Sequence, residues 1–178
     1  MPLSHTLLPE FDNEMALARK TLERVPDDKM TWKPHEKSMS MGQLATHLAE
    51  IPGWGTVTIQ QESFDLAPPG APPYKPEILE SRQSILERFD KNVTSARELL
   101  AKTPDDQFMR RWTLLMGGTQ IFSMPRLAVV RNMIMNHLIH HRAQLGVYLR
   151  MNDIPLPAIY GPSADEDESP ADKSSAAG

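Results

Sequence analysis

The chain has 178 residues, a formal net charge of −4 at pH 7 and no cysteine. The lack of cysteine excludes a disulfide scaffold, an iron–sulfur cluster, a zinc–thiolate site and a cysteine nucleophile. Residues 163–178 carry five acidic residues against one lysine, so the first 162 residues balance at eighteen acids and eighteen bases, and this neutral body argues against a nucleic acid partner.

Two helices are expected in the first third of the chain. Apolar residues recur at spacings of three and four over residues 7–25, and Pro26 ends the pattern. Residues 40–43 read SMGQ, a capping-box pattern that predicts the start of the second helix. The pair Pro52-Gly53 predicts a kink or break in this helix one turn after His47.

Two further helices are expected at residues 76–100 and 123–151, each with an apolar stripe along one face. Residues 65–75 (DLAPPGAPPYK) are rich in proline and are expected to form a long crossover without helix. Residues 113–122 place two short apolar runs around Gly117-Gly118, which predicts a small hairpin or extended excursion.

A weak internal repeat supports a fold with two similar halves. The segments VPDDKMTW (residues 25–32) and TPDDQFMRRW (residues 103–112) follow the first and third expected helices, and each precedes a helix with histidine on its apolar face. We therefore predict an all-α protein, a four-helix bundle with a long crossover between helices two and three. Trp32 and Trp112, in the repeat segments, are expected to anchor long connections to the bundle.

The expected domain covers residues 1–162, and residues 163–178 are expected to form an acidic disordered tail. No apolar stretch approaches the roughly 20 residues of a membrane span, and the N-terminus lacks the pattern of a signal peptide. We therefore expect a soluble, cytoplasmic protein that makes no membrane contact.

The segment NHLIHHRAQLGVYLR contains the residues with the clearest chemistry. Residues four apart on an α-helix differ by only about 40° in direction, so His137 and His141 share a face. His140 falls well off that face. His47 lies on the apolar face of the second helix and is a plausible third member. Three neutral imidazoles around one ion leave a coordination position for water or substrate, which is typical of catalytic metal sites.

The three histidines have other interpretations besides a metal site. Each imidazole can instead be a core residue with a hydrogen-bond partner. An HExxH protease motif is excluded by Leu138, and di-iron sites require Glu-x-x-His pairs that the chain lacks here. Glu50 remains open as a fourth ligand, as a hydrogen-bond acceptor behind a ligand, or as a solvated surface residue.

Three motifs, MGQLATHLAE, NHLIHHRAQLGVYLR and IPLPAIYGPSADE, resemble the DinB family of small bacterial four-helix proteins, which are related to metal-dependent thiol S-transferases. The resemblance extends over roughly residues 5–167. It implies a DinB-like bundle, usually a homodimer, and a divalent ion, zinc or nickel, held by His47, His137 and His141. His140 is not a ligand in this pattern.

The leading hypothesis is a metal-dependent enzyme that acts on a small-molecule substrate, either a low-molecular-weight-thiol S-transferase or a hydrolase. Because the chain has no cysteine, any thiol must be a cosubstrate. The alternative is a non-catalytic, metal-binding stress-response protein in which the ion is structural. The catalytic residues are unknown at this stage; the polar candidates near the histidines are Glu50, His140, Arg142 and Tyr148.

Overall fold

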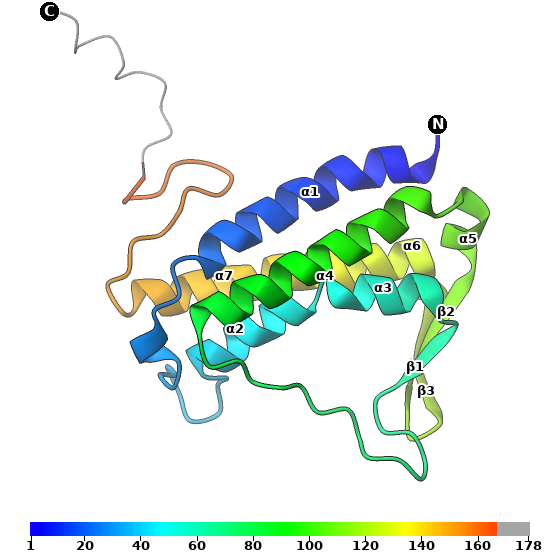
Figure 1. Ribbon diagram of the computed structural model, residues 1–178, viewed down its shortest axis with the longest axis horizontal. Coiled ribbons are helices and arrows are strands. Elements are labelled where there is room, and N and C mark those ends of the chain that lie inside the picture. Colours follow the sequence, from blue (N-terminus) through cyan, green and yellow to red (C-terminus); the bar gives the residue numbers. More distant parts are fainter. Residues whose placement is uncertain (167–178) are drawn as a thin grey trace, which may run out of the picture.

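The computed structural model describes residues 1–166, which form a helical body with a small sheet at one end (Figure 1). The helices are α1 Leu3–Leu22, η1 Asp27–Lys29, α2 Met41–Glu50, α3 Gly53–Gln60, α4 Arg82–Lys102, α5 Asp105–Met109, α6 Arg126–Val129, η2 Val130–Asn136 and α7 His137–Arg150. The strands are β1 Ser63–Asp65, β2 Arg111–Met116 and β3 Thr119–Pro125. No helix in the described part of the chain is long and apolar enough to cross a membrane.

The long helices pack side by side around one apolar core. Helix α1 contacts α4 and α7, and α2 contacts the same two helices from another side. Burying a large apolar side chain stabilises the folded state by about 1.5–3 kcal/mol. The largest fully buried side chains are Phe11, Phe89, Phe108, Leu22, Met41, Leu44, Leu48, Ile51, Ile85, Leu100, Ile134 and Met135.

The capping box predicted for the second helix is confirmed. The Ser40 hydroxyl accepts a hydrogen bond from the Gln43 backbone N–H at 3.2 Å, and the Gln43 side chain accepts one from the Ser40 N–H at 2.8 Å. The predicted break is also present, since α2 ends at Glu50 and α3 begins at Gly53. The cap sets where α2 starts, and the break ends it one turn after His47.

The all-α prediction is wrong in one respect, because a three-stranded sheet is present. Strands β2 and β3 form the hairpin expected near Gly117-Gly118, whose φ angles of 60° and 77° suit a two-residue turn. Strand β1 lies parallel to β2, with Phe64 opposite Leu114. The Asp65 carboxylate accepts hydrogen bonds from the N–H groups of both turn glycines, at 2.9 and 2.7 Å. Strand β1 is only three residues long, and its partner follows nearly fifty residues later, so local pattern could not reveal it.

The fourth predicted helix is present but is not uniform. Its segment η2, seven residues long, is a π-helix between α6 and the histidine-bearing α7. A π-turn inserts extra residues into the helical rise and so rotates every residue that follows, a feature frequent at functional sites. The direction of His137, the first residue of α7, therefore depends on η2 as well as on α-helical periodicity.

The end of the described chain packs on the body. Asp165 pairs with Arg150 and accepts a hydrogen bond from the Leu156 N–H at 2.8 Å, while Glu166 pairs with Arg24. The rest of the acidic tail predicted at residues 163–178 lies outside the described residues.

Candidate metal centre

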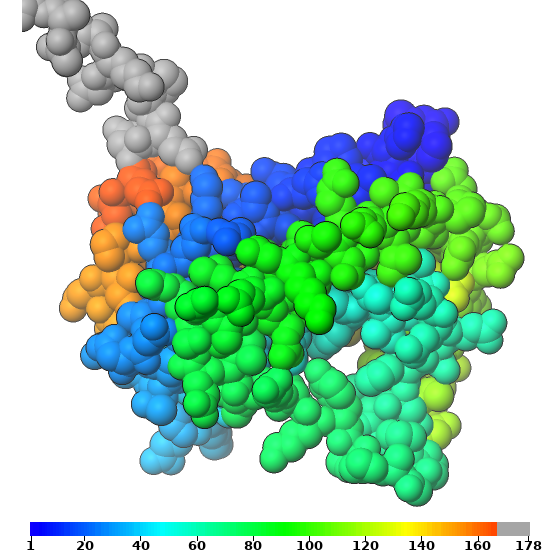
Figure 2. Space-filling view, in the orientation of Figure 1, coloured from blue at the N-terminus to red at the C-terminus, as the bar shows by residue number. Residues whose placement is uncertain are grey.

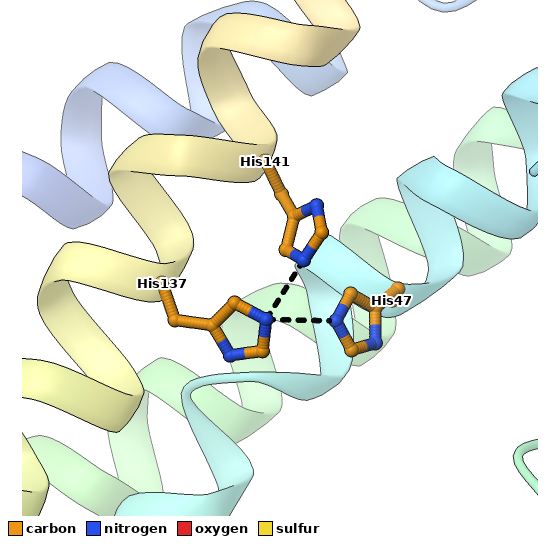
Figure 3. Close-up of side chains that lie close together, drawn as sticks. All are labelled: His47, His137 and His141. Atoms are coloured by element: carbon orange, nitrogen blue, oxygen red, sulfur yellow. Dashed lines mark hydrogen bonds between the residues drawn. The ribbon is translucent and has the colours of Figure 1, made fainter. Parts of the chain in front are cut away.

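Three histidines from two helices meet inside the helical body (Figure 3). His47 projects from α2, and His137 and His141 project from successive turns of α7. Nε2 of His137 lies 3.4 Å from Nε2 of His47 and 2.7 Å from Nε2 of His141. One nitrogen from each ring lies within 4.8 Å of the other two. The structure therefore brings together the three residues predicted from sequence.

The geometry fits one divalent ion. With a metal–nitrogen distance of about 2.0–2.1 Å and tetrahedral angles, two ligand nitrogens are separated by roughly 3.3 Å. The distance of 3.4 Å between Nε2 of His47 and Nε2 of His137 matches this value. Nε2 of His137 and Nε2 of His141 are 2.7 Å apart, the distance of a hydrogen bond, so one of these two rings would rotate slightly outward when both bind the ion. Imidazole nitrogens suit zinc, nickel, copper and iron, so the group can hold such an ion.

Gln144 orients one of the three rings. Its side-chain oxygen lies 2.7 Å from Nδ1 of His141. With Nδ1 as the hydrogen-bond donor, the lone pair of that ring is on Nε2, which faces the other two histidines. Sequence analysis missed this role, although the spacing of three residues on a helix was a usable signal.

His137 lacks such a partner. Its Nδ1 is buried and has no hydrogen-bond partner of good geometry among the described residues, and the backbone carbonyl of Met133 contributes only a weaker interaction. His140, by contrast, is exposed and does not join the group. The prediction that His140 differs from its neighbours therefore agrees with the structure.

Burial keeps the three rings neutral at physiological pH. Desolvation, followed by repulsion from His141 and His137, lowers the pKa of His47 to about 4 from its usual 6.5. Desolvation also lowers the pKa values of His137 and His141; His140 adds to the effect on both, and Gln144 opposes it at His141. Neutral imidazoles have a free lone pair, so all three rings are ready to act as ligands at pH 7.

These lowered pKa values predict a flat pH profile for zinc binding. Protons compete with the ion only as the pH falls through the pKa values of the folded protein, which lie below 6.5. Three imidazoles with the usual pKa would lose roughly 50-fold in combined affinity between pH 7.5 and 6. We expect a loss below about tenfold over the same range. Competition titration against a chromophoric chelator, calibrated at each pH, measures the loss, and a fall near 50-fold would contradict the lowered pKa values.

Glu50 is not part of the histidine group. Its carboxylate accepts a hydrogen bond from the Tyr74 hydroxyl at 3.2 Å and pairs with Arg88 at 3.3 Å. Its side chain is 10% exposed, which argues against the solvated surface role. Desolvation raises the pKa of Glu50, opposed by the Tyr74 hydrogen bond and by Arg88. Among the described residues, Glu50 therefore does not belong to the group that could hold a metal ion.

A cavity of about 480 Å³ adjoins the three histidines, and His137 and Trp54 form part of its wall. The Trp54 ring centroid lies 5.6 Å from that of His47 and 5.5 Å from that of His137. Trp54 therefore forms part of the cavity wall and also packs against the core. Trp112, expected only to anchor a connection, also lines the cavity.

Two other polar candidates have structural roles. Arg142 is 4% exposed and donates to the Glu14 carboxylate at 2.8 Å, so it is a buried structural residue. Its partner Glu14 belongs to α1, far away in the sequence. The Tyr148 hydroxyl donates to the backbone carbonyl of Met39 at 3.2 Å.

The fold of this chain is similar to that of known DinB-like proteins. A DinB-like protein from Bacillus cereus is 21% identical with a TM-score of 0.63, and the match covers 86% of this chain and 95% of that one. A DinB-like protein from Bacillus subtilis is 17% identical with a TM-score of 0.63, covering 92% and 99% respectively. A search of curated proteins gave no match. The model of the DinB superfamily matches residues 10–145. The chain therefore belongs to the DinB superfamily.

Proposed function

We propose that this protein binds a divalent metal ion, zinc or nickel, through His47, His137 and His141, and that it is an enzyme acting on a small molecule. The observation that carries the proposal is the convergence of three neutral imidazole nitrogens beside a cavity. When bound, the ion would supply Lewis-acid activation of a substrate atom.

We further propose that the working unit is a homodimer. We also propose that the helical body of each chain is a four-helix bundle, in which α2 and α3 together form one of the four helices.

The reaction we favour is group transfer to a low-molecular-weight thiol. The thiol gives up its S–H proton, its sulfur forms a bond to an electrophilic carbon, and the leaving group departs with its electron pair. No cysteine in the chain competes as the nucleophile. Within this scheme His47, His137 and His141 hold the ion, and Trp54 excludes water from one side of the histidine group. We assign Glu50 as the proton acceptor, since its carboxylate lines the same cavity as His137 and desolvation raises its pKa above the usual value.

A structural ion is the alternative function. It requires a protein side chain in the fourth coordination position. Glu50, the candidate for that place, instead binds Tyr74 and Arg88. That arrangement favours an open site over a closed one.

Cobalt substitution tests the proposal. We expect about one ion per chain in the cobalt-loaded protein, and a new sulfur-to-cobalt charge-transfer band when mercaptoethanol is added, because an open position accepts an external ligand. Ethylene glycol, which carries hydroxyls and no thiol, is the matched control and should give no such band. A cobalt spectrum that does not respond to the thiol would reject an open site and support the structural alternative. Failure to take up cobalt, zinc or nickel would reject both.

A further inference from the structure

The cavity beside His137 is large enough for a whole small molecule. Its volume of about 480 Å³ falls in the range of ligand pockets, which run from roughly 300 to 1,000 Å³. Its walls come from α3, α4, the η2–α7 helix, the sheet and the connection of residues 66–81. Figure 2 shows an opening on this face, between α3 and α4 above and that connection below. A ligand can thus enter from solvent and reach the histidine group.

Five aromatic rings line the cavity wall. They come from five different segments, so no single element accounts for their convergence: Trp54, Phe64, Tyr74, Trp112 and Phe122. The Phe64 and Tyr74 rings meet edge to face with centroids 5.9 Å apart, and Trp112 and Phe122 lie 6.0 Å apart. Aromatic surfaces arranged around a cavity favour a flat ring that stacks or meets them edge to face.

The cavity offers no unpaired charge. Among the described lining residues, Glu50 and Arg88 are the charged ones, and they form an ion pair with each other at 3.3 Å. The Tyr74 hydroxyl also donates to Glu50, at 3.2 Å. A charged ligand would lose its hydration on entering and would find no free counter-charge. In the metal-free protein the cavity walls therefore select against ions, including carboxylates and sulfonates.

We infer that this cavity binds a neutral, largely aromatic small molecule whose reactive end lies against His137. The assignment of that molecule as the substrate rests on the proposed function, since it places the reactive end beside the metal ligands. Binding of a neutral aromatic compound depends only on the residues that line the cavity. This binding can therefore be tested on the protein without a metal ion. In the proposed transfer, this molecule is the electrophile and the thiol is the second substrate.

A pair of fluorescent probes tests the selection directly. N-phenylnaphthylamine is neutral, and anilinonaphthalene sulfonate adds one sulfonate to the same two ring systems. We expect saturable binding of the neutral probe and at least about tenfold weaker binding of the sulfonate. Equal affinities, or no saturable binding of the neutral probe, would overturn the inference.

Cavity-filling variants locate the probe. Val57 and Leu66 line the cavity, so Val57→Phe and Leu66→Phe should each weaken binding of the neutral probe at least about tenfold. Val147→Phe is the matched control, because Val147 is 59% exposed on α7 and does not line the cavity. Two filling variants are used so that the result stands if one of them folds poorly by circular dichroism. Probe binding that is unchanged in a folded filling variant would overturn the inference.

Zinc titration of the same proteins separates this inference from the proposed function. Val57→Phe should bind zinc as the wild type does while losing the probe. A wild type that binds the neutral probe but takes up no metal would reject the proposed function and leave the cavity assignment supported.

In the cobalt-loaded protein, benzyl mercaptan should bind about tenfold more tightly than mercaptoethanol, and Val57→Phe should remove this preference. A preference that persists in Val57→Phe would place the ring elsewhere and overturn the link between cavity and histidines.

Discussion

Replacing His137 by alanine is expected to abolish metal binding at micromolar concentrations. Its Nε2 is the atom within 3.4 Å of both other ligands, so it occupies the middle of the group. Zinc bound by a full set of protein ligands contributes roughly 10–16 kcal/mol, and one ligand of three accounts for about 4 kcal/mol. That loss corresponds to a decrease in affinity of roughly a thousandfold. Isothermal titration with zinc, and metal content by plasma mass spectrometry, measure the effect.

His47→Ala and His141→Ala should behave in the same way, because each removes one of the three nitrogens. The matched control is His140→Ala, which makes the same chemical change on the exposed side of α7. This control is expected to change affinity by less than about threefold, since the His140 ring is exposed, lies outside the histidine group and interacts with it through solvent. A large loss in His140→Ala, or full binding in His137→Ala, would show that the ion is held by other residues.

The second large effect is expected at Arg142, whose removal should destabilise the fold by about 3–5 kcal/mol. Arg142 pairs with Glu14 at 2.8 Å and also donates to the Tyr160 hydroxyl at 2.6 Å, while that hydroxyl donates to Glu14 at 2.7 Å. Both charged side chains are less than a tenth exposed. Arg142→Ala leaves the Glu14 carboxylate buried without its counter-charge, and that cost exceeds the value of the pair itself.

Urea denaturation measures this loss, and an exposed pair provides the control. Arg97 pairs with Asp12 at 2.7 Å, with the two side chains 49% and 40% exposed. Arg97→Ala should therefore cost no more than about 1 kcal/mol. The double variant Arg142→Met with Glu14→Met should recover most of the stability lost in Arg142→Ala, because it removes the unpaired charge as well. Equal losses in the two single arginine variants would contradict a special role for the buried pair.

The buried pair also bears on the metal centre. Arg142 follows His141 directly on α7, and its bonds to α1 and to Tyr160 fix this part of α7 against the first helix and the C-terminal segment. Gln144 then orients the His141 ring from the same helix. The position of His141 therefore depends on contacts with residues far away in the sequence.

The sequence alone determined the helices and the identity of the histidine group. The capping box at Ser40, the break at Pro52 and the spacing of His137 and His141 are local features, set by backbone hydrogen bonding and by the helical repeat. Such features act over three or four residues, so they can be predicted without knowing the fold. The apolar face of the second helix indicated His47 as the third member, and the resemblance of three motifs to the DinB family implied the same three residues.

Only the tertiary structure decided what surrounds these histidines. Strand β1 pairs with β2 across nearly fifty residues, and that pairing gathers aromatic rings from separate segments around one cavity. The roles of Glu50 and Arg142 also depend on ion pairs with residues from other helices, Arg88 and Glu14 respectively. Hydrogen bonds and ion pairs between distant residues form because the whole core folds as one unit, and no local pattern in the sequence specifies them.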